Sequence, residues 1–163
     1  ITSSKMVNPP FAQFGMSDPK QPLLITVPHG GRDYPPGLAL LSRLPVAQLR
    51  TLEDRFADLL IEGAVSAGHA ALVAKVPRVW VDLNRSEREF DPGLVTTPEG
   101  VVPLASAKVR GGLGVVPRRV LRGGDIWRDR LSAEAFEDRL AGAHRPWHAH
   151  IAARLETLFE RFG

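Results

Sequence analysis

The chain has 163 residues, of which 44% are hydrophobic and 24% are charged, and it contains 15 glycines, 14 prolines and no cysteine. This composition is typical of one globular domain and excludes a collagen-like repeat, a coiled coil, a disulfide framework and a thiolate zinc site. The net charge of +3 and the 7% aromatic content argue against a nucleic-acid-binding protein.

The first 45 residues predict an extended arm followed by a buried strand. Residues 1–20 are polar and contain proline, without the apolar stretch of a signal peptide or a membrane span, so we expect a cytoplasmic protein. Residues 22–28 form an apolar run between two prolines, which predicts a strand buried on both faces. We therefore divide the chain into an arm over 1–20 and a single α/β domain over 21–163.

The middle of the chain predicts a helix and two further strands. Apolar residues recur at helical spacing over 46–67, and Gly68 is in the position of a helix C-cap. Residues 71–76 and 79–83 are apolar runs, and both predict strands. The order of strand, helix and strand favours an α/β fold with a mostly parallel or mixed sheet flanked by helices.

The last part of the chain predicts long loops and a closing helix. Residues 86–130 are rich in glycine, proline and charge, so we expect loops with one short strand. A helix is predicted to begin at Ser132, a good N-cap residue, and Pro146 is expected to kink or divide it.

Polar residues follow two of the predicted strands, where functional groups collect in open α/β sheets. His29 follows the first strand and is flanked by glycines, which suits a metal ligand or a proton-transfer group, although a simple turn would also explain it. Asn84 and Arg85 follow the third strand, and a guanidinium there binds a carboxylate unless it is an ordinary surface charge. Asp54 becomes a site candidate if it faces His29.

Two further patterns are weaker. His144 and His148 have the i, i+4 spacing of two ligands on one helix face, but Pro146 lies between them, and we interpret them as packing or exposed histidines. The glycines of residues 111–114 lack the ending of a phosphate-binding loop.

Taken together, the chain contains an ordered series of short motifs from about residue 21 onward. They are Val27-Pro28-His29-Gly30-Gly31-Arg32-Asp33-Tyr34-Pro35, Leu52-Glu53-Asp54-Arg55-Phe56-Ala57-Asp58-Leu59, Val81-Asp82-Leu83-Asn84-Arg85, Phe90-Asp91-Pro92, Gly112-Leu113-Gly114-Val115-Val116-Pro117-Arg118 and Arg145-Pro146-Trp147-His148. In this order and spacing the series resembles the N-formylglutamate amidohydrolase family.

The resemblance implies a zinc-dependent hydrolase with a three-layer α/β fold of the carboxypeptidase or phosphorylase/hydrolase-like type. Such enzymes release formate from N-formyl-L-glutamate or cleave a related N-acyl amino acid. Carried over by position, His29 and Asp54 would be metal ligands, and Asn84 and Arg85 would hold the carboxylate of this small-molecule substrate.

The chain departs from the family after Gly163, where family members continue into a strand with an Asp-x-His-Ser motif that supplies the third zinc ligand. No such motif occurs here, so the third ligand and the general base are not identified. We expect that the chain is a fragment or a short homologue, or that late histidines replace the missing ligand. A homo-oligomer or another partner would cover the exposed sheet edge. The alternative function is a non-catalytic carboxylate-binding or assembly module.

Overall fold

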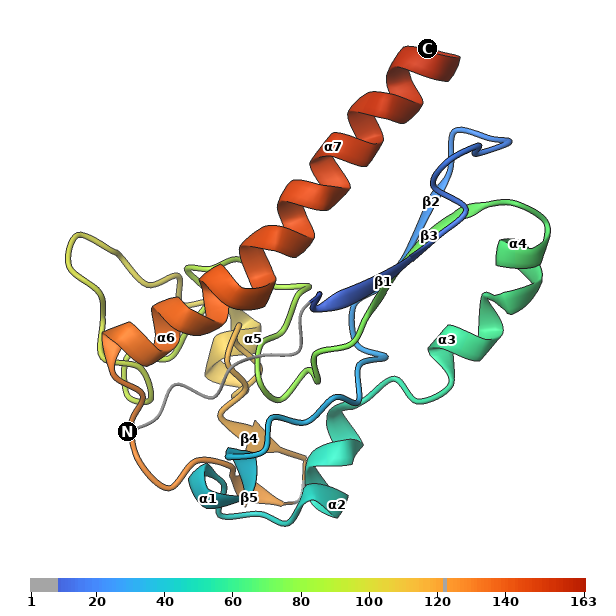
Figure 1. Cartoon of the computed structure of the whole chain (residues 1–163). Helices are drawn as coiled ribbons and strands as arrows, with labels where there is room; N and C mark the ends of the chain where they lie inside the picture. The colour runs from blue at the N-terminus through green and yellow to red at the C-terminus, as the bar shows by residue number, and fades with distance from the viewer. Residues whose placement is uncertain (1–8, 122) are drawn as a thin grey trace.

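The structure, a computed structural model, describes residues 9–121 and 123–163, and Figure 1 shows the path of the chain. Its main sheet contains β1 (Phe11–Phe14), β2 (Leu24–Val27) and β3 (Ala70–Ala74). β3 lies in the centre, parallel to β2 and antiparallel to β1. The mixed α/β class is therefore confirmed, and so are the strands predicted over 22–28 and 71–76, within a few residues at each end. The expected burial of the first strand on both faces is wrong, because β2 is an edge strand and Thr26 is exposed on it. The extended arm expected over 1–20 is wrong for residues 11–14, which form the other edge strand, while residues 1–8 lie outside the described part.

The single helix predicted over 46–67 is wrong. The segment instead forms α2 (Val46–Leu49), a 3-10 turn (Arg50–Leu52), α3 (Ala57–Leu60) and α4 (Glu62–Ser66). The helix is interrupted because Asp54 donates its amide to the carbonyl of His29 and Phe56 adopts a left-handed backbone with φ of 69°. Tertiary contacts around Asp54 therefore override the helical periodicity.

The strand predicted over 79–83 is also absent from the described structure. Trp80 donates its amide to the carbonyl of Pro77 in a turn, and Asp82 donates its amide to Val115. The apolar side chains of this segment are nevertheless buried, as Val81 at 0% exposure illustrates. The apolar run thus indicated burial correctly, but its backbone pairs with loops instead of a sheet.

The remaining loops contain short helices and strands. α1 (Leu38–Leu41) precedes α2, α5 (Ala107–Arg110) follows a long loop, and β4 (Arg119–Val120) pairs antiparallel with β5 (Gly124–Asp125). The predicted loop-rich character of residues 86–130 is confirmed, with two very short strands in place of one. Figure 1 shows these pieces gathered below the main sheet.

The closing helix is divided as expected from Pro146. α6 (Ala133–Arg139) begins at Ser132, whose hydroxyl accepts a hydrogen bond from the amide of Ala135, and a π-helical segment (Leu140–His144) then leads into α7 (Arg145–Phe162). Proline has no amide hydrogen and its ring clashes with the preceding turn. The helix therefore changes from α-helical to wider π-helical hydrogen bonding just before Pro146.

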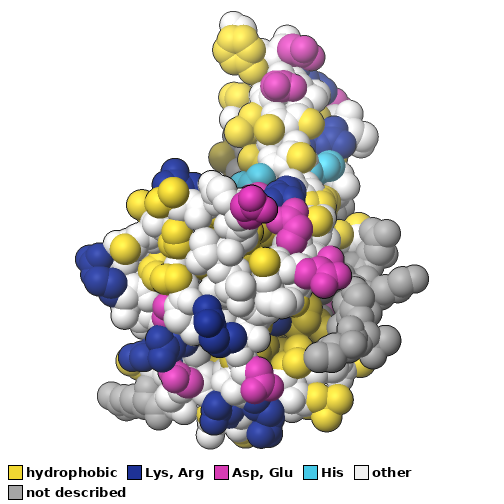
Figure 2. Space-filling view, turned by 90° about the vertical axis from the view of Figure 1, so that its left-hand side faces the viewer, with side chains coloured by type: hydrophobic (Ala, Val, Ile, Leu, Met, Phe, Trp, Pro, Cys, Tyr) yellow, Lys and Arg dark blue, Asp and Glu magenta, His cyan; other side chains and the backbone are white. Residues whose placement is uncertain are grey.

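The core lies between the main sheet, the buried 79–83 segment and the first half of α7. Phe11 of β1 packs edge-on against Trp147 of α7, with ring centroids 5.8 Å apart. Beyond this contact α7 projects from the body (Figures 1 and 2). Leu155 and Phe159 are exposed on α7. Among the described residues, no helix has the length and apolar character needed to cross a membrane.

Candidate functional site

His29 lies just beyond the end of β2, and its loop passes very close to the segment after β3. Asp33 donates its amide to the carbonyl of Lys75 at 2.9 Å. A Cβ on Gly31 would lie 2.0 Å from the carbonyl oxygen of Val76, so only glycine allows this approach. Gly31 therefore allows the loop after His29 to lie directly against the segment that follows β3. His29 itself is 7% exposed.

Both ring nitrogens of His29 face carboxylates. Nε2 is 2.7 Å from Oδ1 of Asp82, and Nδ1 is 3.3 Å from Oδ2 of Asp54. Asp82 is fully buried, whereas the Asp54 side chain is 59% exposed. When Nε2 donates its hydrogen to Asp82, a neutral ring turns its Nδ1 lone pair toward Asp54 and toward solvent.

Asp82 connects the two clusters that the sequence pointed to. Its Oδ1 accepts hydrogen bonds from His29 and from the backbone amide of Asn84, and its Oδ2 accepts one from Nε of Arg78 at 2.9 Å. Nε of Arg85 lies 4.0 Å from the same Oδ2. His29, the backbone of Asn84 and Arg85 are thus brought together around one buried carboxylate, and Asp54 joins them through His29.

The electrostatics of Asp82 favour its ionised form. Burial alone would raise the pKa of this carboxyl. The hydrogen bond and charge of His29, the charge of Arg78 and the amide of Asn84 outweigh burial and hold the pKa of Asp82 below its usual value. A buried negative charge with these partners fixes the His29 ring in one orientation.

The segment before Asp54 is held by a second buried contact. Tyr34 donates its hydroxyl hydrogen to Glu53, and Nε of Arg55 lies 3.5 Å from the other oxygen of Glu53. Burial and the neighbouring Glu53 carboxylate raise the pKa of Tyr34, which therefore stays protonated. Together with the bond from the Asp54 amide to the His29 carbonyl, this contact explains why Asp54 leaves the helix.

Arg85 is anchored, while Asn84 is exposed. Arg85 donates from Nε to the carbonyl of Leu113 at 3.3 Å and from Nη1 to the carbonyl of Asn84 at 3.1 Å. Its side chain is 18% exposed, so a guanidinium in a fixed orientation reaches the surface beside the site. Such an anchored fork is suited to a carboxylate.

His29 and Asp54 fit a metal ion as a pair of ligands. Two ligands of a tetrahedral zinc ion, with bonds of about 2.0–2.1 Å, are roughly 3.3–3.4 Å apart. The Nδ1–Oδ2 separation of 3.3 Å matches this spacing, and Asp82 behind the ring is the carboxylate that such histidines usually have. Within residues 9–121 and 123–163, no three histidine or acidic side chains come together as a complete ligand set.

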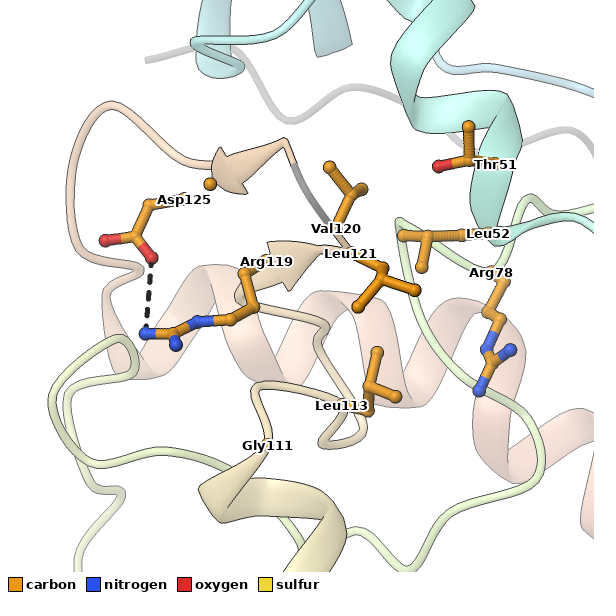
Figure 3. A pocket seen from close by; sticks show the side chains of 10 residues that line it. Thr51, Leu52, Arg78, Gly111, Leu113, Arg119, Val120, Leu121 and Asp125 are labelled. Atoms are coloured by element: carbon orange, nitrogen blue, oxygen red, sulfur yellow. Dashed lines mark ion pairs between the residues drawn. The ribbon is translucent and has the colours of Figure 1, made fainter.

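Two cavities begin at arginines that approach Asp82. The larger, of about 980 Å³, is bordered by Arg78 and Leu52, and Figure 3 shows its apolar side chains between Arg78 and the Arg119–Asp125 ion pair. The smaller, of about 700 Å³, is bordered by Asn84 and Arg85 and by residues of the π-helical segment and α7. The two cavities therefore reach the arginines around Asp82, whereas His29 and Asp54 line neither of them.

The late histidines lie beside the second cavity. The rings of His144 and His148 are 4.4 Å apart, and His144 is buried while His148 is exposed. Burial and the adjacent His144 lower the pKa of His148. The glycines of residues 111–114 form a turn after α5, and Gly112 has a φ of 83° with the Arg119 side chain against its Cα.

Sequence reasoning did not single out Asp82 or Arg78 as site residues. Asp82 is the only acidic residue in the apolar run from Val79 to Leu83, and a lone carboxylate in a buried run needs a partner. That signal was available. Arg78 precedes the same run and offered no pattern of its own.

Comparison with known proteins shows what this chain is similar to. The family model described as N-formylglutamate amidohydrolase matches residues 21–163. The crystal structure of N-formylglutamate amidohydrolase from Ralstonia eutropha JMP134, at 2.00 Å resolution, is similar with a TM-score of 0.86 and 28% sequence identity. The match covers 94% of this chain and 54% of that one, so this chain spans about half the length of that protein. Among curated proteins, no sequence matches significantly.

Proposed function

Since the chain belongs to the N-formylglutamate amidohydrolase family, we propose that its site hydrolyses the amide of N-formyl-L-glutamate or a related N-acyl amino acid with the help of zinc. One observation carries the proposal: buried Asp82 joins His29, a candidate metal ligand, to Arg85, a candidate carboxylate-binding group. A three-layer, carboxypeptidase-like arrangement of the whole domain belongs to the same proposal.

The metal would be held by Nδ1 of His29 and a carboxylate oxygen of Asp54. A zinc ion supplies a Lewis acid for the acyl carbonyl and a water nucleophile at neutral pH. Asp82 keeps the hydrogen of His29 on Nε2, which leaves Nδ1 free to bind the metal. Water or further ligands from outside this pair would complete the shell.

The substrate carboxylate would be bound by Arg85. Its guanidinium is oriented by the carbonyls of Leu113 and Asn84, so little freedom is lost when a carboxylate binds. Arg78, fixed by Asp82, presents a second positive charge at the border of the larger cavity. Each arginine favours an anionic group over a neutral amide in the cavity that it borders.

The direct test is formate release by the zinc-loaded chain from N-formyl-L-glutamate and from its α-carboxamide analogue. We expect the carboxylate substrate to be preferred and Arg85→Ala to lose that preference, with kcat/KM falling about 10- to 150-fold because charge-assisted hydrogen bonds contribute about 1.5–3 kcal/mol. Arg43→Ala is the matched control, because Arg43 also donates to backbone carbonyls but contacts Trp127 and Arg128.

Two results would contradict the proposal. Equal preference in parent and Arg85→Ala proteins would remove Arg85 from the substrate site. Carboxylate binding without formate release by the zinc-loaded chain would indicate a binding module instead of an amidohydrolase.

A further inference from the structure

The segment that carries Asn84 and Arg85 obtains part of its hydrogen bonding from side chains. Residues 80–87 form neither a strand nor a helix. Nη1 of Arg139, in α6, donates to the carbonyl of Trp80 at 3.0 Å, and Nε2 of His144 donates to the carbonyl of Arg85 at 2.7 Å. Two side chains from the divided helix thus bind carbonyls on both sides of Asp82.

The next residue along the helix extends this contact. Arg145 donates from Nε and Nη2 to both oxygens of Glu87 at 3.0–3.2 Å. Nδ1 of His144 lies 3.6 Å from the same carboxylate. Two consecutive residues of the divided helix, His144 and Arg145, therefore hold residues 85 and 87 of this turn-rich segment.

His144 is a closely packed group in this contact. It is 4% exposed, its ring packs at 4.4 Å on His148, and its Nε2 bond is among the short ones in the site. It is the last residue of the π-helical segment, whose wider turn sets the direction in which this side chain leaves the helix. Proline two residues later accounts for that wider turn.

We propose that His144 is a positioning residue that holds the Arg85 peptide and so aims the Arg85 guanidinium at the substrate carboxylate. This inference rests on the proposed function, in which Arg85 binds the substrate. His144 binds the carbonyl of the peptide that joins Arg85 to Ser86, and the guanidinium folds back onto the carbonyl of Asn84 in the preceding peptide. The two peptides meet at the Cα of Arg85, so together they determine where its side chain points. When the side chain of His144 no longer binds the Arg85 carbonyl, this peptide can rotate. The Arg85 guanidinium then loses its fixed direction.

The test compares two substitutions that differ in reach. In His144→Gln the side-chain amide nitrogen takes the place of Nε2 and donates to the same carbonyl, whereas the shorter side chain of His144→Asn does not reach it. His150→Asn is the matched control, because His150 is on α7 and contacts Phe11 and Arg154 instead of the Asn84–Arg85 segment.

The first measurement is hydrogen exchange of the backbone amides of residues 82–87, which needs no ligand. We expect exchange to rise about tenfold in His144→Asn, consistent with the loss of one buried hydrogen bond, and at most about twofold in His144→Gln and His150→Asn. Unchanged exchange in His144→Asn would overturn the proposal.

The second measurement is the ratio of affinities for N-formyl-L-glutamate and its α-carboxamide analogue. His144→Asn is expected to lose most of the carboxylate preference, with His144→Gln restoring it. Raised exchange with an unchanged preference would overturn the positioning role. A parent protein without any carboxylate preference would refute the proposed function, and the exchange data would still decide whether His144 holds the segment.

A third measurement covers the case in which His144→Asn does not fold. Long-range ¹⁵N–¹H spectra of the parent protein show which ring nitrogen of His144 carries a hydrogen. The proposal requires a hydrogen on Nε2. A neutral ring protonated only on Nδ1 would overturn it.

Discussion

Replacing Asp82 with asparagine tests the buried carboxylate at the centre of the site. The substitution keeps the shape of the side chain and exchanges one acceptor oxygen for an NH₂ group. In the parent, the two oxygens accept from His29, Asn84 and Arg78. In the variant, the NH₂ group must face the N–H of Arg78 or the ring of His29.

Both orientations of the new amide are unfavourable. Facing Arg78, two donors oppose each other in a buried site. Facing His29, the amide forces the ring hydrogen onto Nδ1, which removes the lone pair directed at Asp54. We therefore expect a loss of about 3 kcal/mol in the free energy of unfolding at pH 7, at the lower end for a broken buried ion pair, because some acceptors remain. Zinc affinity is expected to fall about 10- to 100-fold.

The effect on stability should depend on pH in a defined direction. The pKa of Asp82 is lower in the folded protein than its ordinary value of about 3.9. Its stabilising contribution is therefore complete above about pH 4 and is lost as pH falls through the folded pKa. The stability difference between parent and Asp82→Asn should close under acid conditions.

The assay is urea unfolding at pH 7 and at about pH 3, with zinc affinity measured by calorimetry. Asp91→Asn is the matched control, because Asp91 pairs with Arg118 at 2.8 Å away from His29 and is partly exposed. We expect this control to lose about 1 kcal/mol or less and to leave zinc affinity unchanged. If Asp82→Asn behaves like Asp91→Asn, then Asp82 does not organise the site.

Three further substitutions test separate contacts. Asp54→Asn should weaken zinc binding less than removal of His29 does, because an amide oxygen remains a poor ligand, and unaltered calorimetric affinity would point to Glu53 instead. Arg85→Lys should recover only part of the substrate affinity lost in Arg85→Ala, since an ammonium lacks the planar fork; full recovery in a binding titration would argue against a bidentate contact. Ser132→Ala should lower the free energy of unfolding by about 1 kcal/mol through loss of the α6 cap, and a denaturation curve identical to that of the parent would show that the cap contributes nothing.

Sequence patterns predicted which candidate residues lie close together better than they predicted the helices and strands around them. The motif around His29 predicted a loop after a buried strand, because prolines and glycines constrain the backbone locally. Asn84 and Arg85 were placed beside it, even though the segment before them is a turn and not a strand. The apolar run over 79–83 predicted that this segment is buried. That burial places Asp82 and its neighbours in the interior, even though the segment is not a strand.

The breaks in the helices depended on contacts that the sequence does not display. The helical spacing over 46–67 is real, yet the amide of Asp54 bonds to His29, which is distant in the chain. The partnership of His144 with the Arg85 carbonyl likewise requires knowledge of how α6 and α7 lie against residues 80–87. Pro146 predicted the division of the helix but not the π-helical form that it takes.

Zinc binding by the chain and by His29→Ala tests the proposed metal site most directly. Calorimetry with the purified proteins, supported by elemental analysis, reports both stoichiometry and affinity. We expect close to one zinc per chain in the parent and none retained in His29→Ala, with the fold preserved although the variant loses the buried hydrogen bond to Asp82. Equal zinc binding by the two proteins, or none by the parent, would contradict a metal site at His29 and Asp54.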